Sequence, residues 1–200
     1  MVSIDIAKRL AVFATILLLS HVGNARAFDD YEVSPPVEVM SQPTENTCWA
    51  ATATMLYAWK QRASYSIADV ASLAGDDFAT RLRENDSLPV GAKLELLSAL
   101  NLVAEPPSNP SIEGWRTLLI KHGPLWVTTV DSGTGFSLHA RILVGIAGDG
   151  TPDGTMLDII DPMGGVSTQE IFTTFVRKFE EVAKRDLGAS GDLRAQIVHG

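Results

Sequence analysis

The stretch QPTENTCWAA, residues 42–51, contains the single cysteine of the chain, next to a tryptophan and at the start of a predicted helix. Asn46 or Thr47 can cap this helix, because such side chains accept hydrogen bonds from the unpaired N–H groups of a first turn. Apolar residues then continue at helical spacing through residues 48–60. The pattern places Cys48 in the first helical turn, where it is either a buried apolar residue, a disulfide partner or a nucleophile.

The N-terminus predicts the compartment in which this thiol acts. Lys8 and Arg9 precede an apolar run over residues 10–19, and small residues follow at Ala25 and Ala27. This is the pattern of a signal peptide over residues 1–27 and predicts a secreted or periplasmic protein. The run has about half of the ~20 residues that a spanning helix needs, so we expect no membrane span in the mature chain.

Composition limits the remaining possibilities. About 160 residues lie between the signal peptide and a charged tail, which is enough for one domain. The net charge of −8 and the pI near 4.9 argue against a surface that binds nucleic acid, which needs clustered Lys and Arg. We expect an extended lead-in over residues 28–41, one domain over 42–183, a loosely ordered tail over 184–200, and a monomer.

Exported proteins usually pair their structural cysteines. One cysteine cannot form an intramolecular disulfide, so Cys48 is buried and inert, bonded to another chain, or kept for its reactivity. Its position in the chain does not decide among these alternatives.

The predicted elements place helices before strands. Helices are predicted over residues 48–60, 66–75, 91–101, 111–123 and 168–181, and strands over 125–130, 137–147 and 155–161, with turns at 131–135 and 148–154. This order predicts an α+β fold in which an N-terminal helical sub-lobe meets a C-terminal antiparallel sub-lobe at a cleft.

The predicted strand over 137–147 places its polar residues on one face. Alternate residues of a strand point to opposite sides, so His139 and Arg141 lie opposite an apolar face that we expect to form the core. His139 is then either a cleft residue or a solvated surface histidine. Asp161 ends the next strand before Pro162, and it either approaches the imidazole or simply starts a turn.

Together these residues form a candidate catalytic set. A helix start favours a thiolate at Cys48, a nearby His139 can act as base, and Asp161 can orient the imidazole. Gln42 lies six residues before Cys48, where its amide can donate to an oxyanion, although it is also an ordinary polar loop residue.

The motifs Gln42, Cys-Trp-Ala-Ala from Cys48, HARILVGI from His139 and IIDP around Asp161 resemble the papain-like cysteine proteases. The resemblance is to a compact bacterial branch that includes secreted avirulence-effector proteases of plant pathogens and double-glycine leader peptidases. It implies a papain-like fold with Cys48 as nucleophile, His139 as base, Asp161 as orienting residue and Gln42 in the oxyanion hole. The larger papain group differs, since it usually has Asn as third member.

The resemblance implies an exported cysteine peptidase that hydrolyses peptide bonds through a thioester, acts on a peptide or protein substrate and needs no cofactor. Two alternatives remain: an acyl transferase of transglutaminase type and a catalytically silent binding module. No metal site is predicted, because no cluster of His, Cys or carboxylates has zinc spacing. His122 is expected to contact helix-terminal carbonyls, His199 lies in the tail, and residues 149–154 form a turn rather than a calcium loop.

Overall fold

The structure is a computed structural model that describes residues 28–131 and 137–200. The predicted signal peptide and nearly all of the predicted turn at 131–135 lie outside the described residues. Within the described part of the chain, no helix has the length and apolar character needed to cross a membrane.

The described residues form an α+β fold of helices and strands. The helices of the described residues are α1 (Cys48–Gln61), α2 (Ile67–Ala74), α3 (Asp76–Arg83), α4 (Val90–Ala99), α5 (Ile112–His122) and α6 (Phe172–Ser190). The strands are β1 (Tyr31–Glu32), β2 (Val103–Ala104), β3 (Leu125–Val130), β4 (Leu138–Gly148), β5 (Thr155–Asp161), β6 (Val166–Ile171) and β7 (Ile197–His199).

The strands form one sheet in the order β2-β7-β3-β4-β5-β6, with β1 paired to β4, and every pairing is antiparallel. β4 lies at its centre: Ile142 pairs with Trp126 of β3 on one side and with Ile160 of β5 on the other. The register between β4 and β5 shifts between Leu143 and Gly145. This bulge reverses which side chains of β4 face each side of the sheet.

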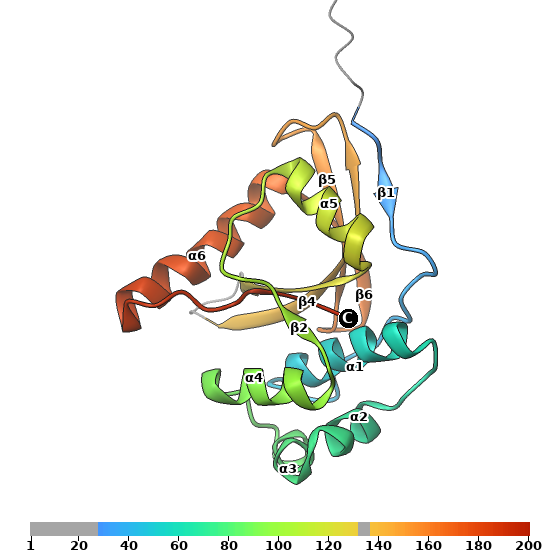
Figure 1. The fold of residues 1–200 in the computed structure, drawn as a ribbon, viewed down its shortest axis with the longest axis vertical. Coiled ribbons are helices and arrows are strands. Elements are labelled where there is room, and N and C mark those ends of the chain that lie inside the picture. The colour runs from blue at the N-terminus through green and yellow to red at the C-terminus, as the bar shows by residue number, and fades with distance from the viewer. Residues whose placement is uncertain (1–27, 132–136) are drawn as a thin grey trace, which may run out of the picture.

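Both faces of the sheet are covered by helices, as Figure 1 shows. The core on one face joins α1 and its neighbouring helices to Trp126 and Ile142, and the core on the other joins α5 and α6 to Leu143 and Ile146. The expectation of a single apolar face on β4 is therefore wrong. Because helices cover both faces of the sheet, β4 has apolar residues on each face. The bulge places Ile146 on the face opposite to that of Ile142.

Several helix limits follow from local chemistry. Ser66 accepts a hydrogen bond from the Asp69 N–H, and Ser111 accepts one from the Gly114 N–H, so α2 and α5 each begin with a side-chain cap. Helix α3 is absent from the sequence prediction. It starts directly after Gly75, where the predicted helix over 66–75 ends, because this glycine is the boundary between two helices.

Two predictions about the C-terminal third are wrong. Residues 168–171 belong to β6, since they pair with β5, and the helix begins only at Phe172. Residues 184–200 were expected to be loosely ordered, but α6 continues to Ser190 and β7 pairs with both β2 and β3. Figure 1 shows this segment returning from α6 across the molecule, toward α1.

The predicted lead-in over residues 28–41 is extended, and part of it also belongs to the sheet. Tyr31 and Glu32 form β1, and Val33 donates a backbone hydrogen bond of 2.8 Å to the Val144 carbonyl of β4. Val33 and Val37 are buried in the two different cores. The segment therefore contributes to both faces of the sheet.

Candidate active site

Cys48 is the first residue of α1 and is a free, partly exposed thiol. The preceding Thr47 is fully buried, and its hydroxyl donates a 2.8 Å hydrogen bond to the Thr44 carbonyl. The predicted cap is not formed, because Thr47 accepts no hydrogen bond from the first turn of α1. Trp49 is buried on the other side of Cys48, and its indole N–H donates 3.0 Å to the Asp86 carbonyl. Buried neighbours on both sides fix the start of the helix. The thiol lies where first-turn N–H groups and the helix dipole favour negative charge.

The loop before Cys48 is anchored to two distant segments. Asn46 exchanges hydrogen bonds with Asn85: its backbone N–H donates to the Asn85 side chain at 2.9 Å, and its side chain donates to the Asn85 carbonyl at 3.0 Å. At the other end of the loop, the Gln42 N–H donates 2.8 Å to the Pro162 carbonyl. The second bond ties this loop to the turn that carries Asp161.

The Gln42 side chain lies in this loop and is partly exposed. Its amide nitrogen Nε2 donates 2.8 Å hydrogen bonds to the carbonyls of Thr44 and Glu45. Its Oε1 is buried without a hydrogen-bond partner. The amide protons are thus bound within the loop, so donation from Gln42 to an oxyanion requires one of these two bonds to be exchanged.

His139 lies near the start of β4 and is buried, with its Nε2 2.7 Å from Oδ1 of Asp161. Burial disfavours the charged imidazole, but hydrogen bonds with Asp161 and Cys48, together with their negative charges, outweigh it and raise the pKa of His139 to about 9. Because Nε2 faces Asp161, Nδ1 is the ring nitrogen left for the thiol. The imidazole therefore lies between the carboxylate and Cys48.

Asp161 ends β5 and is half-buried. Burial disfavours its charged form, but the hydrogen bond and charge of His139 lower the pKa of Asp161, helped by the Met163 N–H and by Arg141. The Met163 N–H donates 2.8 Å to Oδ1, the same oxygen that faces His139. The turn after β5 thus fixes the carboxylate that orients the imidazole.

The structure brings Cys48, His139 and Asp161 into one chain of contacts and places Gln42 on the adjoining loop, with its amide nitrogen bonded to the Thr44 and Glu45 carbonyls. Sequence reasoning missed Asn85 and the Pro162 carbonyl, which hold the loop in place. Asn85 has a positive φ of 59° at the end of α3, a conformation that Asn adopts readily. Only the tertiary fold brings it to residue 46.

The residues with other predicted roles lie elsewhere. The turn at 149–154 connects β4 to β5, and Asp149 accepts hydrogen bonds from the Thr151 N–H and hydroxyl at 2.8 and 2.6 Å. These hydrogen bonds to the Asp149 side chain close a hairpin turn, as predicted.

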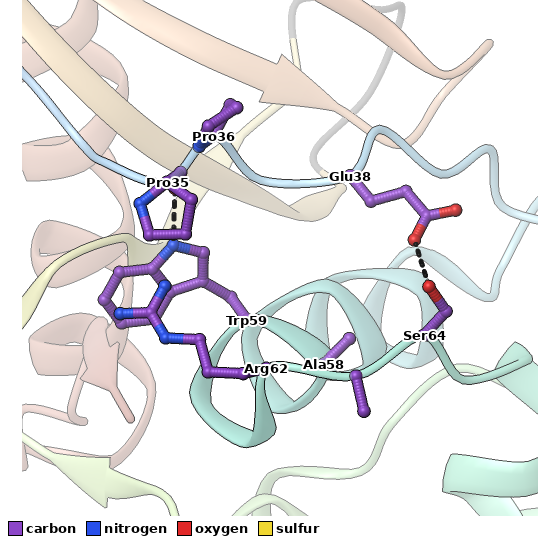
Figure 2. Close-up of a pocket in the computed structure, with 8 residues that line it drawn as sticks. Pro35, Pro36, Glu38, Ala58, Trp59, Arg62 and Ser64 are labelled. Atoms are coloured by element: carbon purple, nitrogen blue, oxygen red, sulfur yellow. Dashed lines mark hydrogen bonds between the residues drawn. The ribbon is translucent and has the colours of Figure 1, made fainter.

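A surface pocket of about 360 Å³ lies at the opposite end of α1 from Cys48. Figure 2 shows its central contact, in which the Trp59 indole N–H donates 2.8 Å to the Pro35 carbonyl and the Arg62 guanidinium covers the indole ring at 4.3 Å. The pocket's lining includes none of the four predicted site residues, so it has no place in the candidate chemistry.

Comparison with known proteins finds one matching family model and similar solved structures. The model of the family described as papain-like cysteine protease AvrRpt2 matches residues 29–180. Among solved structures, the chain is similar to the peptidase domain of Streptococcus ComA, a bifunctional ABC transporter involved in a quorum-sensing pathway, with a TM-score of 0.47 and 17% sequence identity over 72% of this chain and 93% of that one. A search of curated protein sequences finds no significant match.

Proposed function

The chain belongs to the papain-like cysteine protease family of AvrRpt2 and is a cysteine protease with the α+β fold of that group, and from this premise we propose that Cys48 is its nucleophile. The observation that carries the proposal is the 2.7 Å contact between His139 and Asp161, beside a thiol at a helix start. It joins a nucleophile, a base and an orienting group in one chain of contacts.

The raised pKa of His139, about 9, keeps the imidazole protonated at neutral pH. Its positive charge stabilises a Cys48 thiolate, which attacks the carbonyl carbon of a peptide bond and forms a tetrahedral oxyanion. His139 then donates its proton to the leaving amine as the C–N bond breaks, which leaves a thioester on Cys48. Water, deprotonated by His139, hydrolyses the thioester and releases the acid product.

The oxyanion needs hydrogen-bond donors at the position where its charge develops. We infer that the Cys48 backbone N–H and the Gln42 amide supply them. Gln42 is supported by its place on the loop between Cys48 and the Asp161 turn. In this proposal the oxyanion replaces the Thr44 or Glu45 carbonyl as acceptor for one Nε2 proton, an exchange of one hydrogen bond for a charge-assisted one.

Export is the second part of the proposal. Residues 1–27 have the charged start, short apolar run and small-residue end of a signal peptide. Mass spectrometry of protein recovered outside the cytoplasm should find an N-terminus near residue 28. Recovery of the exported protein with residues 1–27 intact would remove the signal peptide from the proposal.

Selective alkylation tests the nucleophile. Iodoacetamide at mildly acidic pH should label Cys48 in the wild type and label it far more slowly in His139→Ala, because an unassisted thiol is protonated there. The chain has one cysteine, so the site of labelling is unambiguous. Turnover of a mixed peptide library should vanish in Cys48→Ser. Equal labelling of wild type and His139→Ala would contradict the proposed pair.

A further inference from the structure

A second group of functional side chains lies outside the candidate active site. Glu105 directly follows β2, His122 is the last residue of α5, and His199 is in β7. The His199 Nε2 is 3.0 Å from Oε1 of Glu105, and the His122 Nε2 is 3.6 Å from the same oxygen. All three atoms lie within 4.8 Å of one another. Three segments far apart in the sequence thus direct one ligand atom each toward a common point.

One of these three ligand atoms makes no hydrogen bond. The His122 Nε2 is buried and has no hydrogen-bond partner. The His199 Nδ1 lies 3.2 Å from the Gly200 carbonyl, to which it can only donate. With its proton on Nδ1, a neutral His199 presents an Nε2 lone pair toward the Glu105 carboxylate, and a cation bound between them can accept electron pairs from both; without a cation, a proton on Nε2 donates to Glu105.

The Nδ1 contact of His199 to the Gly200 carbonyl is the kind of support that orients histidine ligands in metal sites, where the neutral imidazole is the form that binds the ion.

We propose that Glu105, His122 and His199 together bind one divalent transition-metal ion, of which Zn²⁺ fits best. Two imidazoles and one carboxylate form a ligand set suited to zinc rather than to Mg²⁺ or Ca²⁺, which prefer oxygen ligands. A tetrahedral zinc with bonds of about 2.0–2.1 Å separates its ligand atoms by about 3.3 Å. The two contacts to Glu105, at 3.0 and 3.6 Å, lie on either side of that value.

Binding requires a small opening of the two imidazole rings. They are stacked with centroids 3.7 Å apart, and two histidines on one tetrahedral ion diverge further than this. The Glu105 and His122 side chains are 26% and 14% exposed, so an ion can reach the site and a water can occupy its fourth position.

The position of the site indicates a structural role. His199 pairs with Val103 in the sheet, and the Glu105 N–H donates 2.9 Å to the Ile197 carbonyl. An ion bound here therefore fastens the C-terminal strand to β2 and to the end of α5. It touches none of the residues proposed for peptide cleavage, so the two proposals stand or fail separately.

Zinc binding is best measured in the Cys48→Ser variant, because this change removes the one thiol of the chain as a competing ligand. Calorimetric titration should give one Zn²⁺ per chain. At about 100-fold above its Kd, Zn²⁺ should raise Tm by roughly 5–10 °C, and Mg²⁺ should not. Co²⁺ should give the visible absorption of a four-coordinate site.

Glu105→Gln in the same background keeps the size of the side chain and removes its charge. It should weaken Zn²⁺ binding by more than about tenfold. Loss of a group that only orients a metal ligand already lowers metal affinity by about 10- to 100-fold. His122→Gln should abolish the Co²⁺ absorption. Glu95→Gln, on the exposed face of α4, is the matched control and should bind as the parent does. No Zn²⁺-dependent rise in Tm, or the same rise in Glu105→Gln, would overturn the proposal.

Discussion

At the scale of single residues, one carboxylate oxygen of Asp161 makes two hydrogen bonds. Its Oδ1 pairs with the His139 Nε2 and accepts from the Met163 N–H. Asp161→Asn retains an acceptor at this position and should lower kcat/KM by about tenfold, through loss of the charge that stabilises the imidazolium. Asp161→Ala also loses the orientation of the ring and should cost roughly 10²-fold or more. Peptide hydrolysis measures both effects.

Asp158 is the matched control for Asp161. Its carboxylate accepts a 2.8 Å hydrogen bond from the Gln169 side chain of the neighbouring strand. It has the opposite strand parity from Asp161, so Asp158→Ala should leave turnover almost unchanged. Loss of turnover in Asp158→Ala but not in Asp161→Ala would show that the orienting residue is misassigned.

Gln42 should affect turnover more than reactivity of the thiol. Gln42→Ala removes one proposed oxyanion donor and should reduce kcat by about 10²- to 10³-fold. Labelling of Cys48 by iodoacetamide should persist, because it depends on His139 and not on the oxyanion. A thermal melt checks that the loop still folds without the bonds to Thr44 and Glu45. Unchanged kcat would exclude Gln42 from the mechanism.

The pKa of His139 also makes stability depend on pH. Its folded value of about 9 is above the ordinary value of 6.5, so the folded state holds the proton more tightly. The resulting stabilisation is fully present below pH 6.5 and is lost as the pH rises through about 9. Relative to His139→Ala, the wild type should lose on the order of 2–3 kcal/mol of unfolding free energy across this window, measured by urea unfolding. If the difference in unfolding free energy between wild type and His139→Ala stayed constant with pH, the raised pKa of His139 would be contradicted.

At the scale of elements, Gly123 fixes how α5 ends against α1. It has a φ of 78°, and an added Cβ would lie 2.2 Å from the Trp59 ring. Gly123→Ala should therefore cost more than about 2 kcal/mol of unfolding free energy, from backbone strain and overlap with the indole. Gly188→Ala in α6 is the control, since nothing lies within 4 Å of its Cβ position. It should be neutral or stabilising by about 0.5–1 kcal/mol.

Element types were predicted well where a local signal existed. The capped helices α2 and α5 and the strands β3 and β5 lie where the sequence places them. Residues 168–171 of β6 are predicted as helix, because Ile171 and the following Phe172 continue a helical spacing. The pairing of β6 with β5 supplies backbone hydrogen bonds that no local pattern encodes.

At the scale of the whole molecule, β7 joins the two cores. Ile197 is buried with α5 and α6, whereas Val198 is buried on the face that α1 covers. Ile197→Ala and Val198→Ala should each lower the unfolding free energy by about 2–4 kcal/mol in a single transition, because each leaves a cavity in a closed core. Leu193→Ala, at a side chain 43% exposed, is the control and should cost far less. Wild-type stability in both buried variants would instead indicate a dispensable tail.

The sequence alone determined the fold class and the candidate catalytic set. A thiol at a helix start, a histidine near the start of a strand and an aspartate before proline are local features, and each indicates the kind of backbone that carries it. Their chemistry follows from residue type, which needs no coordinates.

Tertiary structure alone decided which distant groups meet. The packing of helices covers both faces of β4. The fold also pairs Asn85 with Asn46, and the Gln42 N–H with the Pro162 carbonyl. It brings His122, His199 and Glu105 together as well. These contacts depend on sheet pairing and helix packing between segments far apart in the chain. Such pairings are set by burial and by hydrogen bonds that must be satisfied across the whole molecule, and neither is visible in a local pattern.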